Sequence, residues 1–180
     1  HSHSHKGWEF EIKDEFTLHS VAEDFEFVVI TPDWKGNVWF ASYDSQAGFL
    51  NPETGQFFTI SLSERKNEFF ANSISSSPFG VAIATTHALY VLNLKNKQPR
   101  IVWQAEYNRG NKVKPGQLSW GTGSSPSFFG PKDGYEYLTI LDNGTEGKRL
   151  NIYNSKTGKL LASELAFEGE IEQGSENSPI

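Results

Sequence analysis

A hairpin turn that occurs twice in nearly the same form constrains the fold of this chain more than any other feature. The two copies are Asn51-Pro52-Glu53-Thr54-Gly55 and Asn154-Ser155-Lys156-Thr157-Gly158. In each copy the Asn begins a turn, and the Gly that ends it is free to take a positive φ and return the chain as an antiparallel strand. A duplicated turn of this kind indicates a duplicated structural unit.

The spacing of other similar segments gives the size of that unit. Gly7 to Ile12 resembles Gly55 to Ile60, and Phe70 to Ile74 resembles Ser175 to Ile180. These separations correspond to one and two periods of roughly 50 residues, which is the length of a four-stranded β-propeller blade. The alternative is an ordinary β-sandwich whose hairpins are similar by coincidence.

The distribution of β-forming residues agrees with a blade repeat. The chain has 14 Phe, 6 Tyr and 5 Trp, and its β-formers cluster in short runs bounded by Gly, Pro, Asn, Asp and Ser. No segment outside these runs has a sustained helical period of apolar residues. We therefore predict an all-β fold, a β-propeller section of about three four-stranded antiparallel blades with flanking strands. The blades are expected near residues 27–62, 71–107 and 118–166.

The segments outside these blades indicate an incomplete ring. Within a partial propeller at 7–180, residues 7–18 have the pattern of an outer strand of a preceding blade, and residues 176–180 begin a following inner strand. Residues 1–6, where His alternates with Ser, are expected to be a flexible tail or tag remnant. Closed propellers typically have about four to eight blades, so three cannot close a ring. We expect a section of a longer propeller, a homodimer, or remaining blades supplied by another chain.

Composition excludes several classes of function. The chain has no Cys, which rules out disulfides, thiolate zinc sites and cysteine nucleophiles. Its 16 Lys and Arg stand against 22 Asp and Glu without a basic stripe, a balance that opposes nucleic-acid binding. No apolar run reaches the roughly 18 residues that span a bilayer. We expect a soluble chain without a membrane partner, in either the cytoplasm or the periplasm.

Several motifs together resemble the quinoprotein-like β-propeller group. The blades of that group carry an apolar-x-[DN]-x-x-T-G turn, which Leu50 to Gly55 and Tyr153 to Gly158 match. From Asn72 onward the chain is also similar to an uncharacterised bacterial branch of the group. This similarity is carried by Gly80 to Ile83, Ala88 to Tyr90, Trp103 to Tyr107, Lys114 to Gln117, Gly121 to Ser127 and Ile140 to Asn143. The resemblance implies a partial propeller.

Two departures from that group bear on its cofactor. Quinoprotein dehydrogenases usually place a Trp four residues after the turn Gly, whereas Thr59 and Ala162 stand there in this chain. Many also carry adjacent cysteines beside the cofactor, and this chain has none. Binding of pyrroloquinoline quinone is therefore not expected, since a fold can be shared without its function.

One candidate metal site follows an apolar run. Asp142 and Asn143, with Gly144 behind them, come directly after Tyr137 to Leu141. Oxygen ligands at the end of a strand can bind calcium or a substrate. Asp-Asn-Gly is also strong turn chemistry that needs no ligand. No cofactor is firmly predicted, and calcium at Asp142 and Asn143 stays open beside the turn interpretation.

Further polar residues fall where inner strands are expected to begin. Asn72, Ser73, Glu176 and Asn177 occupy equivalent positions there. Inner strands line the central channel of a propeller, so these side chains can converge on a small-molecule ligand. The alternative is that a hydrated channel wall needs polar side chains whether or not a ligand binds.

A Gly-rich segment from Gly121 to Ser125 adds Thr122 and Ser124 to the channel candidates. Its backbone amides could hold an anion, but no Lys follows at the Walker spacing and no helix opens after it. The segment therefore favours a closely packed approach to an inner strand over a phosphate loop.

The sequence favours a non-catalytic binding or assembly module. It contains no G-x-S-x-G elbow, and His19 and His87 belong to no ligand pair. The alternative is an enzyme of the lactonase or quinoprotein type. In such an enzyme Asp, Asn and Glu at the channel mouth hold a divalent ion that polarises a carbonyl or orients a cofactor.

Overall fold

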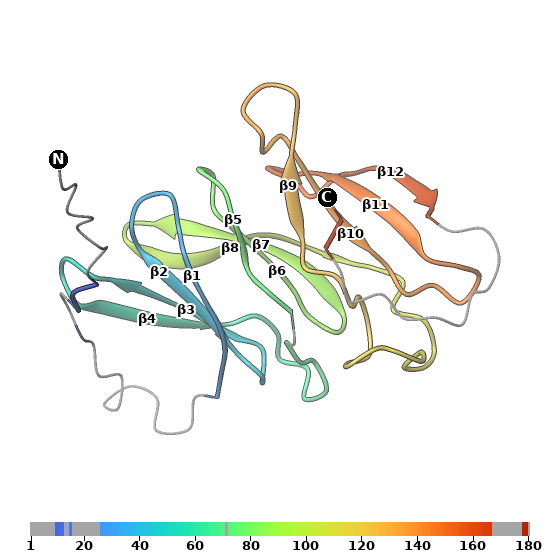
Figure 1. Cartoon of the computed structure of the whole chain (residues 1–180), viewed down its shortest axis with the longest axis horizontal. Coiled ribbons are helices and arrows are strands. Elements are labelled where there is room, and N and C mark those ends of the chain that lie inside the picture. Colours follow the sequence, from blue (N-terminus) through green and yellow to red (C-terminus); the bar gives the residue numbers. More distant parts are fainter. Residues whose placement is uncertain (1–9, 13–14, 16–25, 71, 167–177, 180) are drawn as a thin grey trace, which may run out of the picture.

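A computed structural model describes residues 10–12, 15, 26–70, 72–166 and 178–179 of the chain. Within these residues the structure contains β-strands and no helix. The strands form three four-stranded antiparallel sheets that follow one another along the chain (Figure 1). The predicted all-β fold of three four-stranded antiparallel blades is confirmed, and we number the sheets blades 1 to 3.

Strands that are neighbours in sequence are neighbours in each blade. Blade 1 consists of β1 (Phe27–Pro32), β2 (Val38–Ser42), β3 (Gln46–Asn51) and β4 (Gln56–Ser61). Blade 2 consists of β5 (Ser75–Ser76), β6 (Val81–Ala84), β7 (Ala88–Lys95) and β8 (Gln98–Glu106). Blade 3 consists of β9 (Ser127–Phe129), β10 (Tyr137–Leu141), β11 (Arg149–Asn154) and β12 (Leu160–Leu165). The flanking strands predicted at 7–18 and 176–180 fall largely outside the described residues.

Blade 2 is buried on both faces, because alternate residues of its middle strands face different neighbours. Val81 and Ile83 of β6 pack in the core shared with blade 1, whereas Ala82 and Ala84 pack in the core shared with blade 3. Successive side chains of a strand point to opposite faces of its sheet, so a strand between two cores has to be apolar at every position. This requirement explains the uninterrupted apolar run of β6.

Large aromatic side chains dominate the core between blades 1 and 2. Trp39 and Phe49 lie with ring centroids 5.6 Å apart, and both are almost completely buried. Phe70 from the linker and Tyr90 from β7 join them. Burying apolar surface contributes about 25 cal/mol per Å², so these rings are a main source of the cohesion between the two blades.

The duplicated turn has the same conformation in blades 1 and 3. Gly55 and Gly158 have φ angles of 66° and 71°, which confirms the prediction of a positive φ at both. The amide of each Gly donates to the carbonyl of the Asn that begins its turn, at 2.8 and 2.9 Å. Blade 2 replaces this turn with a tight hairpin in which Asn96 and Lys97 have φ angles of 52° and 63°.

The inner strands lie side by side, since β1 contacts β5 and β5 contacts β9. Because the strands of each blade alternate in direction, their connections fall on two sides. The linker side carries the β2–β3, β6–β7 and β10–β11 turns together with the linkers 62–74 and 107–126. The far side carries the remaining turns. The polar groups described below lie on one or the other of these two sides.

Candidate functional site

The described residues among the predicted candidates gather on the linker side. Asn72 and Ser73 precede β5, and the Asn72 side-chain amide donates to the Thr122 carbonyl at 3.0 Å. Their predicted counterparts, Glu176 and Asn177, lie outside the described residues. The structure thus brings the first linker into direct contact with the Gly-rich part of the second.

The hydroxyls of Thr122 and Ser124 are used within the protein. They lie 2.9 Å apart, the Thr122 hydroxyl also donates to the Leu141 carbonyl, and the Ser124 hydroxyl accepts from the Leu141 amide at 3.0 Å. Gly121 has a φ of 118°, and a Cβ there would lie 2.9 Å from the Thr86 backbone. This geometry is the close packing that the Gly-rich sequence favours.

The Asp142 carboxylate closes the β10–β11 turn. One of its oxygens accepts from the Gly144 and Arg149 amides at 3.1 and 2.9 Å. The other accepts from the Asn151 side-chain amide at 3.3 Å. This network is what a turn-forming Asp provides, and it leaves the carboxylate buried with three donors around it.

Asn143 is completely buried beside this turn. Its side-chain NH2 donates to the Arg109 and Lys112 carbonyls at 3.0 and 3.3 Å, whereas its Oδ1 has no hydrogen-bond partner among the described residues. The described part of the chain contains no group of three or more His, Asp or Glu residues arranged to hold a metal ion. Calcium at Asp142 and Asn143 stays a prediction that needs a direct test.

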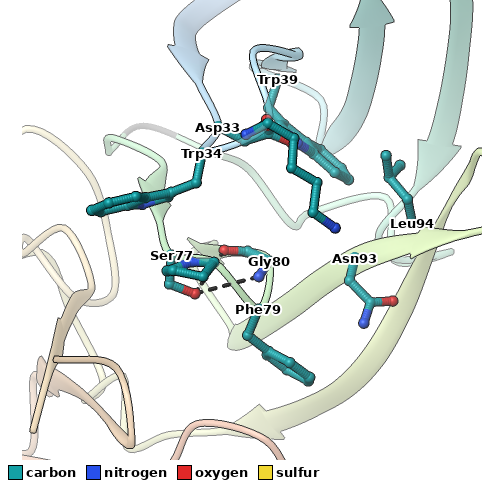
Figure 2. A pocket seen from close by; sticks show the side chains of 10 residues that line it. Asp33, Trp34, Trp39, Ser77, Phe79, Gly80, Asn93 and Leu94 are labelled. Atoms are coloured by element: carbon teal, nitrogen blue, oxygen red, sulfur yellow. Dashed lines mark hydrogen bonds between the residues drawn. The ribbon is translucent and has the colours of Figure 1, made fainter. Parts of the chain in front are cut away.

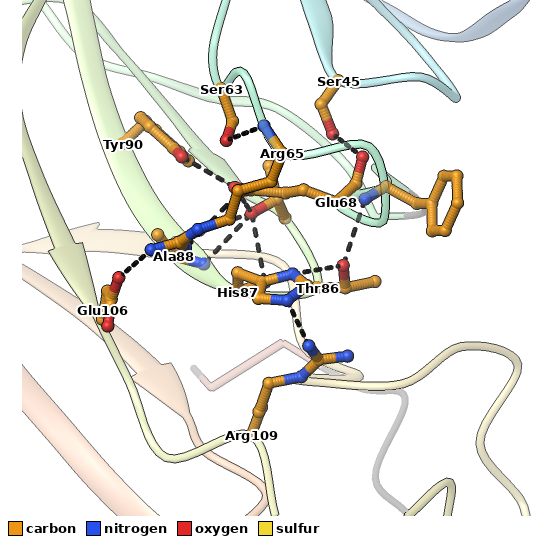
Figure 3. A network of polar contacts seen from close by, with 12 residues as sticks. Ser45, Ser63, Arg65, Glu68, Thr86, His87, Ala88, Tyr90, Glu106 and Arg109 are labelled. Carbon is orange, nitrogen blue, oxygen red and sulfur yellow. Dashed lines mark hydrogen bonds and ion pairs between the residues drawn. The ribbon is translucent and has the colours of Figure 1, made fainter.

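A buried carboxylate, Glu68, joins the first linker to blade 2 (Figure 3). One of its oxygens accepts from the Thr85 hydroxyl at 2.5 Å and from the Tyr90 hydroxyl at 2.7 Å. The other lies 3.7 Å from the half-exposed Arg65 guanidinium. Burial raises the pKa of Glu68, but the hydrogen bonds from Thr85, Tyr90 and Ser63 outweigh it and hold the pKa below its usual value of 4.5.

A second chain of polar contacts crosses from blade 2 to the second linker (Figure 3). The His87 Nε2 and the Arg109 guanidinium are in hydrogen-bond contact, and the His87 Nδ1 lies 3.1 Å from the Thr86 hydroxyl. Arg109 in turn lies 3.8 Å from the centroid of the Trp120 ring. Burial and the neighbouring Arg109 charge both lower the pKa of His87, so the neutral imidazole accepts from Arg109 and donates to Thr86.

The site residues predicted from the sequence include none of Glu68, His87 and Arg109. Thr86 and His87 occupy the β6–β7 turn just as Asp142 and Asn143 occupy the β10–β11 turn. Comparing equivalent turns of successive blades is therefore the signal that would have found His87. Glu68 and Arg109 have no such signal, because their partners come from other segments.

An exposed indole separates two hollows on the far side. The Asp33 carboxylate orders the β1–β2 turn by accepting from the Lys35 and Asn37 amides at 2.8 and 3.0 Å, and it accepts from the Trp39 indole at 3.0 Å. Trp34 points away from these groups (Figure 2), and its Nε1 donates to the Ser76 carbonyl at 3.3 Å. The Trp34 residue is left 70% exposed.

The two hollows differ in size and in the blades that line them. A hollow of about 80 Å³ lies between blades 1 and 2, bordered by Trp34, Lys35, Phe79 and Asn93 (Figure 2). A larger one of about 370 Å³ is lined by all three blades, namely by Trp34, Ser75, Ser76, Ser77, Pro78, Ser127, Phe128, Asp133, Gly134 and Tyr135. We call the larger one the three-blade hollow. Because inner strands contribute to it, it lies beside the channel of the propeller.

The outward face of blade 3 carries a third, apolar hollow. It has a volume of about 540 Å³ and is lined by Ser127, Phe128, Phe129, Thr139, Leu150, Ile152, Ser178 and Pro179. The Thr139 hydroxyl on this face is buried and has no hydrogen-bond partner among the described residues. An apolar face with an unsatisfied polar atom is typical of a surface made to be covered.

No helix in the described residues is long and apolar enough to cross a membrane.

The chain matches no protein-family model. It is 30% identical over 143 residues to an uncharacterised protein of Archaeoglobus fulgidus, an alignment that covers 78% of this chain and 27% of that protein. The chain thus spans about a quarter of the length of this relative. The relative is archaeal, so the expected bacterial branch is not confirmed.

Solved β-propellers are similar to the chain in fold. The WD40 domain of Neurospora crassa Pan2 has a TM-score of 0.54 and 11% identity, covering 81% of this chain and 40% of that one. The Cps50 (Swd1) propeller of Myceliophteria thermophila has a TM-score of 0.51 and 10% identity, covering 89% of this chain and 49% of that one. Quinohemoprotein alcohol dehydrogenase of Comamonas testosteroni has a TM-score of 0.55 and 14% identity, covering 81% of this chain and 28% of that one. At these identities the similarity shows the fold alone, which is that of a partial β-propeller.

Proposed function

We propose that the chain is a binding and assembly module, a set of three consecutive blades whose ring is completed when a further blade packs on the outward face of blade 3. The observation that carries this proposal is the equivalence of that face with the face of blade 2 that blade 3 covers. Thr139 and Ile152 pair across β10 and β11, just as Ala82 and Val91 pair across β6 and β7. Ala82 and Val91 are buried by blade 3, and their counterparts line the apolar hollow.

The energetics support covering this face. Burial of apolar surface contributes about 25 cal/mol per Å², so leaving this apolar face in water would promote association. The proposed cover is a second copy of this chain, because a two-fold pair lets each copy cover the other's open face. The similar propellers are consistent with an incomplete ring, since this chain covers 40% and 49% of two of them.

Light scattering across a concentration series tests the proposal. We expect a mass that rises above the 20.2 kDa of one chain. Ile152→Arg, which places a charge on the outward face, should return the mass to that of one chain. Val113→Arg changes an exposed aliphatic residue of the second linker and should leave association intact.

Two results would contradict the proposed assembly. One is a monomer at every concentration. The other is association that Ile152→Arg leaves unchanged, since the contact would then involve another surface.

A further inference from the structure

We propose that the three-blade hollow on the far side binds a small organic ammonium cation, with the Trp34 indole as its aromatic wall and the Asp133 carboxylate as its counter-charge. The inference goes beyond the proposed assembly, because it names a ligand class for the binding module. It does not depend on how the ring is completed, since every lining residue named here belongs to this chain.

The position of Trp34 is the first argument. The residue is 70% exposed, yet the hydrogen bond from its Nε1 to the Ser76 carbonyl holds the indole across the inner strand of blade 2. The ring borders both hollows, so it forms the wall between them. A fixed and exposed indole face is a ready platform for a cation, because the negative face of the ring quadrupole attracts positive charge.

Two further aromatic rings line the same hollow from blade 3. Phe128 and Tyr135 are both only partly buried. The Tyr135 ring already attracts an ammonium group, since the Lys156 Nζ lies 5.8 Å from its centroid. Aromatic side chains from two blades thus border a space of about 370 Å³. Such a lining suits the methylated head of a quaternary ammonium compound.

The charged side chains that line the hollow determine whether a cation or an anion binds there more favourably. Asp133 is the one charged residue among the described residues that line it, and Lys, Arg and His are absent from that lining. The Asp133 amide donates to Glu136 at 2.9 Å, which orders the loop. The same Glu136 carboxylate accepts from the Lys132 and Tyr135 amides at 3.0 and 3.2 Å. Asp133 thus gives the lining of the hollow a negative charge, which favours a cation over an anion.

A titration with matched probes tests the ligand class. Choline and tetramethylammonium would be titrated by calorimetry, with 3,3-dimethyl-1-butanol as the uncharged isostere of choline and methyl glucoside as a neutral sugar. We expect saturable binding of both cations with a Kd of about millimolar order. The uncharged isostere should bind at least about tenfold more weakly, because it lacks the cation–π and carboxylate interactions.

Variants assign the binding to the hollow. Trp34→Leu and Asp133→Asn should each weaken choline binding roughly tenfold, and Trp34→Phe should retain part of it. Lys156→Gln should strengthen binding, because it removes a competing ammonium group from the Tyr135 ring. Glu53→Gln is the matched control for Asp133→Asn, since it also neutralises an exposed carboxylate but lies away from the hollow.

The outcomes separate this inference from the assembly proposal. Equal binding of choline and its uncharged isostere, preference for the sugar, or absence of saturation by choline would each overturn the ligand class. Choline affinity that Trp34→Leu and Asp133→Asn leave unchanged would place the cation elsewhere and overturn the site. Ile152→Arg should leave choline binding intact, so a failed assembly test with preserved choline binding counts against the assembly alone.

Discussion

The two equivalent turn glycines provide a controlled test of the close packing between the blade 3 turn and Trp103 of blade 2. Gly55→Ala and Gly158→Ala place the same methyl group at nearly the same φ, 66° and 71°. A Cβ on Gly55 meets no atom within 4 Å, whereas a Cβ on Gly158 would lie 2.6 Å from the Trp103 ring. The difference between the two variants therefore reports the contact between blades, with the backbone strain cancelled.

The structure sets the expected magnitudes. A side chain forced into a positive φ costs about 1 to 2 kcal/mol, and this is the whole cost expected for Gly55→Ala. Gly158→Ala adds overpacking of about 1 to 3 kcal/mol. Trp103 cannot move aside freely, because it is largely buried and its Nε1 donates to the Ser155 carbonyl at 2.8 Å. We expect a total of about 2 to 5 kcal/mol for Gly158→Ala.

Urea unfolding followed by circular dichroism measures both variants. The midpoint of Gly158→Ala should fall clearly below that of Gly55→Ala, with an unchanged dependence of the free energy on urea. Trp103→Leu removes the indole. When it is added to each glycine variant, the free energies of unfolding of the two should lie closer together. Two results would refute the packing of Trp103 on this turn. One is an equal loss of unfolding free energy in Gly55→Ala and Gly158→Ala. The other is a difference between their losses that Trp103→Leu leaves unchanged.

Two further predictions concern buried carboxylates on the linker side. Glu68→Gln should lower the free energy of unfolding at pH 7 by about 1 to 3 kcal/mol, because it weakens charge-assisted hydrogen bonds from Thr85 and Tyr90. The folded-state pKa of Glu68 is lowered, so this stabilisation is present above its usual value of 4.5 and is lost as the pH falls below it. The free energy of unfolding of the unsubstituted chain should approach that of Glu68→Gln as the pH falls below 4.5. A difference in this free energy that stays constant there would contradict this reasoning. Asp142→Ala should lower the Tm without calcium, because the β10–β11 turn loses its acceptor. In a melting scan, a Tm that calcium raises in the natural chain but not in Asp142→Ala supports the calcium hypothesis, and an unchanged Tm at millimolar calcium opposes it.

The sequence by itself determined the secondary structure and the repeat. Gly55 and Gly158 were identified because turn chemistry is local, depending on an Asn, a Gly and the residues between them. Most strands of blades 1 to 3 follow from short runs of β-formers and their punctuation, which are also local properties. The short inner strands β5 (Ser75–Ser76) and β9 (Ser127–Phe129) lie outside those runs. The Gly121 to Ser125 segment belongs here as well, since a glycine that must pass close to another backbone leaves its mark in the sequence.

The tertiary structure alone decided which side chains meet. Glu68, His87 and Arg109 come from the first linker, the β6–β7 turn and the second linker, and only the stacking of blades places them in one network. Whether Trp103 docks on Gly158 and whether Trp34 stays exposed depend in the same way on the angle between neighbouring blades. That angle arises from sheet twist and from packing between faces that are distant in sequence, and no local pattern encodes it.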